Sequence, residues 1–243
     1  ITVYNQKNDA IFDICGTGGS GKERINLSTA LAVKLSKKFK IAKHGNKAAS
    51  GRVGSFDLIE RAGFEVSDSP EKVQKNLQDH NLAFVFAPAF HPALKDLAPI
   101  RQNIGHATIF NVLGPLLNPV ESLRGQMTCI FNSVLGTKLA QVAQKLDKNI
   151  LFVHDAAFGL DDVSIGGETR FWKVKNGEIE VGSFFPEDYE LERVEAFSKI
   201  QGGDVEDNFK IFQGLMDGTA PKAHQDFLKI NQLVATEFFE LFL

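Results

Sequence analysis

The sequence predicts an α/β protein whose mostly parallel central sheet is flanked by helices. Two observations carry this prediction: short, nearly continuous apolar runs recur along the chain, and segments of helical periodicity lie between them. Such runs are typical of strands buried on both faces, as in parallel sheets. The 243 residues, of which 43% are hydrophobic, suffice for one large domain with a substantial core.

Strands are expected where apolar, β-branched and aromatic residues run together between turn residues. These runs lie at 10–15, 40–45, 82–88, 126–132 and 149–155. Alternating residues on both sides of Asn176-Gly177 indicate something different, because this dipeptide is typical of two-residue hairpin turns. We therefore predict an antiparallel hairpin over residues 169–186.

Helices are expected between the strands, where apolar residues recur every three or four positions. The predicted ranges are 26–39, 54–63, 69–81, 137–147 and most of 203–243. Ser69 and Pro70 suit the N-cap and first position of a helix. The middle segment 91–119 interrupts the α/β rhythm, since Pro99 breaks its helical pattern.

Composition argues against several classes of function. The net charge is −3, from 27 basic and 30 acidic side chains, so we expect no bulk attraction to nucleic acid or anionic membranes. No apolar run reaches the length of a membrane helix, and the amino end lacks a secretion signal. Cys15 and Cys129 have no metal or redox spacing, which favours a cytoplasmic location. Because the first methionine is Met127, an upstream segment is expected.

The glycine-rich stretch after the first strand, GTGGSGK, matches two phosphate-binding patterns only in part. A P-loop needs a hydroxyl residue after its lysine, but Glu23 follows Lys22 here. A dinucleotide site expects an acidic residue about 20 positions further on, where this chain has Lys43 and His44. An ordinary strand-to-helix turn also fits the glycines taken alone.

A wider anion-binding cradle accounts for more of the residues. Gly16, Gly18 and Gly19 would let backbone N–H groups approach phosphate oxygens. The start of the next helix adds polar side chains and a favourable dipole. Lys43, on the second strand, adds positive charge. The polar residues at the helix start are Asn26, Ser28 and Thr29.

A second polar element follows the strand at 149–155, where Asp161 and Asp162 come after Gly159. Adjacent acids on a loop are often merely solvated. Next to a phosphate cradle, however, two hard oxygen ligands would hold Mg²⁺ that bridges to phosphate oxygens. Because ligands of open parallel sheets bind beyond the carboxyl ends of the strands, both elements are predicted to face one polyphosphate.

Five motifs occur in the order and approximate spacing of one enzyme family: GTGGSGKERINLSTA, KHGNKAASGRVGSFD, APAFHPALKDLAPIR, TIFNVLGPLLNP and GLDDVS. From about Asp13 to beyond Asp204, the chain resembles the anthranilate phosphoribosyltransferases. This resemblance implies phosphoribosyl pyrophosphate (PRPP) and anthranilate as substrates, Mg²⁺ as cofactor and a homodimer. It also implies an α/β domain over 8–90 and 124–243, with 91–123 as the remainder of a small helical domain.

The resemblance implies site residues as well. Those for PRPP are Gly16, Thr17, Gly18, Gly19, Asn26, Ser28, Thr29, Lys43, Asn46 and Ser55. Those for anthranilate are Gly16, His44, Asn46, His91, Arg101 and Gly114, and those for the metal are Ser28, Asp161 and Asp162. Lys43 and Arg101 would serve catalysis, Arg101 by pairing with the acceptor carboxylate through two donors. Taken alone, His44 also fits a structural hydrogen bond and Arg101 a surface charge.

Three departures from the family pattern bear on activity. Ser20 stands where the family usually has Asp, and Asp162 stands where it usually has Glu. The helical segment expected before Ile1, with the usual dimer surface, is absent from the sequence. The alternatives are a pyrimidine nucleoside phosphorylase, which shares the glycine-rich loop, and a fold relative with another acceptor or no activity.

Overall fold

One mixed sheet forms the centre of the computed structural model. The described residues are 1–4, 9–23, 25–46, 55–97, 108–121 and 123–243. Within them, eight strands follow the order β3-β4-β2-β1-β5-β6-β7-β8. Their bounds are β1 (Ile11–Gly16), β2 (Lys40–Gly45), β3 (Val66–Ser67), β4 (Leu82–Phe86), β5 (Gly125–Cys129), β6 (Ile150–Asp155), β7 (Thr169–Lys175) and β8 (Glu178–Phe184).

The first six strands pair in parallel, and β7 and β8 add an antiparallel hairpin at one edge. From β1 the chain crosses to β2 on one side, whereas β5 pairs with the other side of β1. The border between β1 and β5 is therefore the point where the winding direction changes. Open α/β sheets bind ligands at the carboxyl ends of the strands at such a point.

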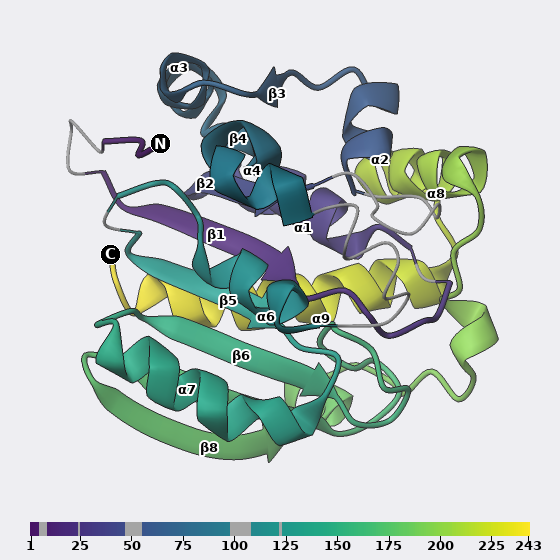
Figure 1. The fold of residues 1–243 in the computed structure, drawn as a ribbon. Helices are drawn as coiled ribbons and strands as arrows, with labels where there is room; N and C mark the ends of the chain where they lie inside the picture. Colours follow the sequence, from purple (N-terminus) through teal and green to yellow (C-terminus); the bar gives the residue numbers. More distant parts are fainter. Residues whose placement is uncertain (5–8, 24, 47–54, 98–107, 122) are drawn as a thin grey trace.

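Helices cover both faces of the sheet (Figure 1). The α-helices are α1 (Leu27–Leu35), α2 (Ser55–Arg61), α3 (Pro70–His80), α4 (Ala87–Phe90), α6 (Ile109–Leu116), α7 (Gly136–Lys145), α8 (Val205–Asp217) and α9 (Lys222–Glu240). Short 3-10 turns are η1 (Pro92–Leu97), η2 (Ser133–Leu135), η3 (Pro186–Tyr189) and η4 (Phe197–Lys199). Figure 1 shows α7 in front of β6 and the long α9 on the opposite side of the sheet.

The central strand β1 is apolar on both faces because each face packs against helices. Phe12 belongs to the core beneath α1, α8 and α9, and its ring stacks on Phe239 with 4.4 Å between centroids. Ile11 points the other way, into a cluster with Val73 and Leu77 of α3. Burial on two faces explains why the sequence of this strand is a nearly unbroken apolar run.

Local signals in the sequence match the observed elements. Asn176 and Gly177 have φ angles of 50° and 80°, the left-handed values that a two-residue hairpin turn requires. Ser69 caps α3 by accepting a hydrogen bond from the Lys72 backbone N–H at 3.3 Å. The two-residue strand β3 was not predicted, since so short a strand leaves no periodicity.

No described helix combines the length and the apolar character needed to cross a lipid bilayer. The proposed division into an α/β domain and a helical remainder at 91–123 stays a prediction. Within that range the structure describes η1 and α6, and Pro115 and Leu116 of α6 are buried.

Candidate active site

The predicted phosphate loop leaves β1 at Gly16 in a conformation that depends on glycine. Gly18, Gly19 and Gly21 have φ angles of 65°, 90° and 69°. A Cβ atom added at Gly18 or Gly21 would meet no atom within 4 Å. The need for glycine there is therefore conformational rather than steric, since L residues rarely adopt these angles.

The glycine loop and the acidic pair are in direct contact. The backbone N–H of Gly18 donates to Oδ2 of Asp161 at 2.8 Å, across 143 residues of sequence. Asp161 and Asp162 are buried, with only 1% and 2% of their surface exposed. The prediction that these segments share one place is confirmed, and the alternative that the two acids are solvated surface residues is wrong.

Further contacts fix the loop against segments far along the chain. The Thr17 N–H donates to the carbonyl of Cys129 at 2.9 Å, and the Thr17 hydroxyl accepts from the N–H of Phe131 at 3.1 Å. Farther on, the Lys22 ammonium donates to the carbonyl of Phe158, and the Gly202 N–H donates to that of Glu23 at 3.2 Å. The loop thus joins β1, β5, the 155–165 segment and the segment before α8.

The start of α1 offers polar groups that the described residues leave unused. Asn26 occupies the N-cap position, but its side chain makes no capping hydrogen bond. Its Nδ2 atom and the hydroxyl of Thr29 are buried and have no hydrogen-bond partner among the described residues. Ser28 is half-buried, and the first turn of α1 contains no acidic residue. This helix end therefore suits an anion, which the helix dipole also favours.

Two histidine rings contact each other near the carboxyl end of β2. His44 is near the end of β2 and His91 follows α4; their ring centroids are 5.3 Å apart in an edge-to-face arrangement. The Nε2 atom of each ring is buried without a partner among the described residues. Burial, helped by the neighbouring His91, lowers the pKa of His44 to about 3, and a hydrogen bond with the Gly114 backbone opposes the shift.

The pKa of His91 is also lowered by burial, against an opposing hydrogen bond with the Leu117 backbone. Both rings are therefore neutral at neutral pH. The structure thus brings together His44, His91 and Gly114, three of the residues expected to contact anthranilate. Arg101 falls outside the described residues.

The remaining predicted residues described by the structure lie in the last part of β2 or follow it in the sequence. Lys43 is buried, and its Nζ donates to the carbonyl of Ile14 in β1 at 3.3 Å. Asn46 is exposed, and Ser55 begins α2. At Gly45 an added Cβ would lie 2.9 Å from the ring of Phe56, so this glycine permits α2 to approach the strand end closely.

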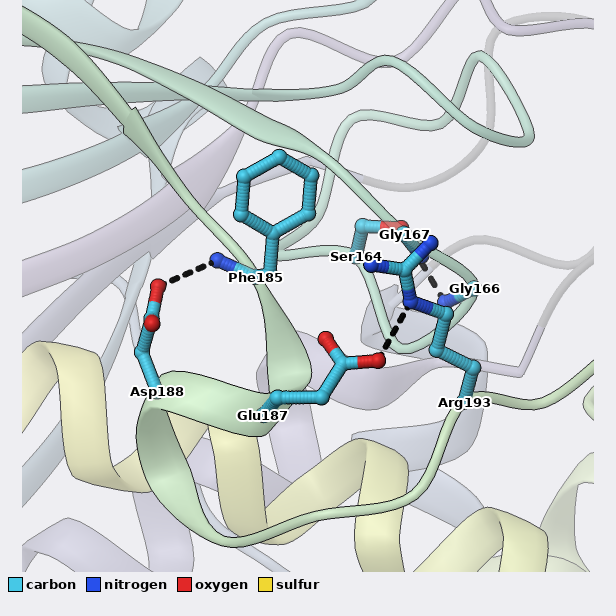
Figure 2. A network of polar contacts seen from close by, with 7 residues as sticks. All are labelled: Ser164, Gly166, Gly167, Phe185, Glu187, Asp188 and Arg193. Atoms are coloured by element: carbon cyan, nitrogen blue, oxygen red, sulfur yellow. Dashed lines mark hydrogen bonds and ion pairs between the residues drawn. The ribbon is translucent and has the colours of Figure 1, made fainter.

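The loop carrying the acidic pair is also fixed beyond Asp162. The Ser164 hydroxyl accepts hydrogen bonds from the N–H groups of Gly166 and Gly167, each at 3.1 Å. Figure 2 shows this turn beside the Glu187–Arg193 ion pair of the 185–193 segment. The N–H of Val194 then donates to the carbonyl of Ile165 at 2.9 Å. The residues after the acidic pair are thus tied to the segment that follows β8.

Comparison with known proteins agrees with this geometry. Residues 8–238 match the glycosyl transferase family, a/b domain. Anthranilate phosphoribosyltransferase from Actinobacillus pleuropneumoniae is 34% identical over 240 residues, which cover 98% of this chain and 71% of the relative. This chain belongs to the anthranilate phosphoribosyltransferase family.

Other members of the family support the assignment. The enzyme from Dictyoglomus turgidum is 40% identical over 225 residues, covering 92% of this chain and 66% of the relative. The chain thus spans just under two thirds of the length of that relative. The crystal structure of the Thermus thermophilus enzyme superposes with a TM-score of 0.84 at 31% identity, covering 99% of this chain and 73% of that one.

A structure of the Saccharomyces cerevisiae enzyme in complex with PRPP and Mg has a TM-score of 0.84 and 29% identity. The alignment covers 96% of this chain and 66% of the yeast enzyme. Another structure of the yeast enzyme, in complex with 4-fluoroanthranilate, has a TM-score of 0.83 and 27% identity.

The donor set fits a magnesium ion better than a transition metal. Among the described residues, no group of three or more His, Cys, Asp and Glu side chains is arranged to hold a metal. Asp161 and Asp162 supply two buried carboxylates. Mg²⁺ is commonly bound by one or two protein carboxylates, with water and substrate phosphates as its other ligands, so these two residues are suitable for it.

Two buried acids near the site were not among the predicted site residues. Asp13 of β1 accepts hydrogen bonds from the N–H of His44 at 3.1 Å and from Nε2 of Gln126 at 2.9 Å. The same Gln126 nitrogen donates to the carbonyl of Pro115 in α6 at 2.6 Å. Asp155 accepts from the N–H groups of Ala157 and Phe158. Burial raises the pKa of both acids.

A sequence signal for these acids existed. Asp13 interrupts the apolar run AIFDIC, and Asp155 ends the run NILFVHD. An ionisable residue inside or directly after a buried strand needs hydrogen-bond partners, so its position indicates a structural polar group. The partners of Asp13 could not be named from the sequence, because His44 and Gln126 come from other strands, whereas those of Asp155 follow it within three residues.

Proposed function

We propose that this protein transfers the phosphoribosyl group of PRPP to the amine of anthranilate, giving N-(5-phosphoribosyl)anthranilate and pyrophosphate. The observation that carries the proposal is the 2.8 Å hydrogen bond between Gly18 and Asp161. It joins a loop suited to phosphate and an acidic pair suited to Mg²⁺ at the carboxyl ends of the strands. Membership of the family supplies the substrates.

The phosphate half of the site would use mostly backbone groups and the start of α1. The loop of Gly16, Thr17, Gly18 and Gly19 would surround the pyrophosphate, and Ser55 and Asn46 would lie at its edge. Because the N–H groups of Thr17 and Gly18 donate to Cys129 and Asp161 in this structure, they would have to exchange these partners to bind the ligand. The unused Asn26 and Thr29 groups are suited to phosphate oxygens, since a buried polar atom without a partner is unfavourable until a ligand satisfies it.

Asp161 and Asp162 would hold Mg²⁺, and the hydroxyl of Ser28 would bind another metal ion at the start of α1. When bound, the ion neutralises the negative charge of the diphosphate and of the leaving pyrophosphate. Asp162 is one methylene shorter than the Glu usual in the family. We therefore expect this chain to bind the ion more weakly than a variant that restores that Glu.

The acceptor half would use the two neutral histidines, Gly114 and, outside the described residues, Arg101. Arg101 would pair with the anthranilate carboxylate. A group with a pKa of about 3 is a poor proton acceptor at neutral pH, so His44 would orient the acceptor by hydrogen bonding rather than deprotonate it.

In the reaction, the amine nitrogen bonds to the anomeric carbon of the ribose while the bond from that carbon to the pyrophosphate oxygen breaks. The proton that the nitrogen then loses passes to solvent. Negative charge grows on pyrophosphate, and the loop amides and the Lys43 charge would stabilise it. Holding both substrates in line supplies much of the acceleration expected of a two-substrate reaction.

The test is to incubate the purified protein with PRPP, Mg²⁺ and anthranilate and to follow anthranilate fluorescence. Loss of fluorescence that requires all three additions supports the proposal. Phosphorolysis of uridine or thymidine in phosphate buffer, without the transfer reaction, would favour the phosphorylase alternative. Calorimetric titration with PRPP and Mg²⁺ that gives no heat of binding would contradict the site itself.

Two further features belong to the same proposal. We expect a homodimer, as the family resemblance implies, and sedimentation analysis checks it. We also place the protein in the cytoplasm; the support is that Cys15 and Cys129 are both buried and form no disulfide.

A further inference from the structure

We propose that two buried asparagines on the last two helices, Asn208 of α8 and Asn231 of α9, are positioning residues for the two halves of the site. Asn208 would fix the phosphate side and Asn231 the acidic side. Their effect on substrate binding depends on the proposed function, whereas their effect on the site backbone does not.

Asn231 forms two hydrogen bonds with the backbone of the residue that follows the acidic pair. Its Oδ1 accepts from the N–H of Val163 at 3.0 Å, and its Nδ2 donates to the carbonyl of Val163 at 3.1 Å. The same Nδ2 also donates to the carbonyl of Phe227, one turn earlier in α9, at 2.9 Å. Because Val163 is directly bonded to Asp162, this pair of hydrogen bonds sets the direction in which the chain leaves the acidic pair.

Asn208 holds the residue at the start of α1 in a similar way. Its Oδ1 accepts from the N–H of Asn26 at 3.1 Å. Its Nδ2 donates to the carbonyls of Gly203 and Asp204, at 2.8 and 3.0 Å, so the side chain is anchored at the first turn of its own helix. Asn26 is thus fixed through its backbone while its own Nδ2 has no partner among the described residues.

Both asparagines are placed where a polar side chain is otherwise unfavourable. They are 3% and 1% exposed, and Asn231 sits among the apolar residues Phe227, Ile230 and Val234 of α9. A side-chain amide both donates and accepts, so it can satisfy an N–H and a carbonyl together. Leucine satisfies neither and aspartate only accepts, so amide chemistry is what these positions require.

A purely structural role is the alternative, and Asn76 provides a matched control. Asn76 of α3 is 5% exposed and donates to the hydroxyl of Ser67 in β3 at 3.1 Å, and Ser67 is not a predicted site residue. Replacement of any of these three asparagines by leucine removes buried hydrogen bonds. Only the changes at 208 and 231 should alter the site specifically.

The first measurement is amide hydrogen exchange on the unliganded protein, followed by mass spectrometry. Asn231→Leu should accelerate exchange of peptides covering 161–168, and Asn208→Leu should accelerate those covering 25–32, each about tenfold or more. Asn76→Leu should leave both regions unchanged. The proposal is overturned if neither region exchanges faster when the asparagine that contacts it is replaced, whatever the activity of the protein.

The second measurement compares the variants in their Mg²⁺ requirement and in the KM for each substrate. Asn231→Leu should raise the Mg²⁺ concentration for half-maximal activity by about 10- to 100-fold, the range typical when a group supporting a metal ligand is removed. Asn208→Leu should raise the KM for PRPP about tenfold and leave that for anthranilate within about twofold. Equal increases for both substrates, or the same increases in Asn76→Leu, would show a general loss of stability instead.

Asn208→Asp and Asn231→Asp keep the inference testable if a leucine variant does not fold. Asn208→Asp retains the acceptor for the Asn26 N–H but loses the donation to the carbonyls of Gly203 and Asp204, so exchange over 25–32 should accelerate by less than about tenfold. Asn231→Asp loses the donation to the Val163 carbonyl, so exchange over 161–168 should still accelerate; unchanged exchange there would count against the proposal. If the unsubstituted protein neither binds PRPP nor turns over, the proposed function fails, yet the exchange comparison still decides the positioning roles.

Discussion

The two halves of the candidate site are organised in opposite ways. The phosphate half presents backbone N–H groups of a glycine loop, and contacts with residues more than 100 positions away fix that loop. The acceptor half presents two side chains, the buried His44 and the half-buried His91, that stand at the ends of regular elements. Substitutions in the first half should therefore act through chain conformation and charge, and those in the second through the loss of one side chain.

The largest effect is expected from Asp161→Asn. It removes a buried negative charge that faces the Gly18 N–H and is suited to Mg²⁺. We expect kcat/KM for PRPP to fall by about 10²- to 10³-fold, the size typical when a preorganised electrostatic group is lost. Steady-state kinetics at several Mg²⁺ concentrations measures this. Asp79→Asn, an exposed position on α3, is the control, and equal activity of the two variants would contradict the metal role.

Next in size is Lys43→Met, which keeps most of the side-chain volume and removes the charge. If the buried ammonium acts on the leaving pyrophosphate, the KM for PRPP should rise by about 10²-fold and that for anthranilate much less. Initial rates with each substrate varied in turn give both constants. Equal increases would instead assign Lys43 to the packing between β1 and β2, where its Nζ contacts the Ile14 carbonyl.

Gly18→Ala tests whether the first half depends on backbone conformation. An alanine at a φ of 65° is strained by about 1 kcal/mol, although its Cβ would meet nothing within 4 Å. We expect roughly a tenfold higher KM for PRPP, with thermal stability lowered only slightly. Gly177→Ala, with a φ of 80° and similar open space in the β7–β8 turn, is the matched control. A similar KM in both variants would show that the loop tolerates the strain.

His44→Gln tests the second half. Glutamine retains a hydrogen-bonding group but loses the ring that packs against His91. The KM for anthranilate should rise about fivefold to tenfold and that for PRPP should stay within about twofold. Initial-rate measurements with each substrate check this. A larger increase in the KM for PRPP than in the KM for anthranilate would instead assign His44 to the phosphate half. The two halves would then not differ in the way described.

The last expected effect is on stability rather than on activity, and it depends on pH. The pKa of His44 is about 3 in the folded protein and near 6.5 in the unfolded chain. Between these values the unfolded chain binds more protons, so the free energy of unfolding decreases as pH falls, by at most about 1.4 kcal/mol per pH unit. Denaturant titrations from pH 7 to pH 4 should show a shallower decline in His44→Gln than in the unsubstituted protein.

Other groups near His44 also affect how stability changes with pH, and the comparison with His44→Gln separates the contribution of His44 from theirs. His91 and Lys43 disfavour its charged form, and Asp13 accepts the His44 backbone N–H. The raised pKa of Asp13 acts in the opposite sense, because the folded protein then binds its proton more readily than the unfolded chain and gains stability on acidification. Identical pH curves for the two proteins would show that His44 does not carry a lowered pKa.

Much of the local structure could be predicted from the sequence. The apolar runs located β1, β2, β4, β5 and β6, Asn176-Gly177 located the hairpin turn, and Ser69 with Pro70 located the start of α3. These features depend on residues within a few positions of each other, so periodicity and turn chemistry determine them. The glycine motif and the aspartate pair likewise identified two segments that the structure brings into contact.

The sequence predicted that these two segments lie together, but only the tertiary structure decided which atoms meet. The order of the strands places Gly18 beside Asp161, buries the charge of Lys43 and lets Gln126 connect Asp13 to α6. It also brings Asn208 and Asn231, from the last two helices, onto the site backbone. Such contacts arise from strand pairing and helix packing between distant segments, and the residues on either side of each partner in the sequence carry no local signal of them.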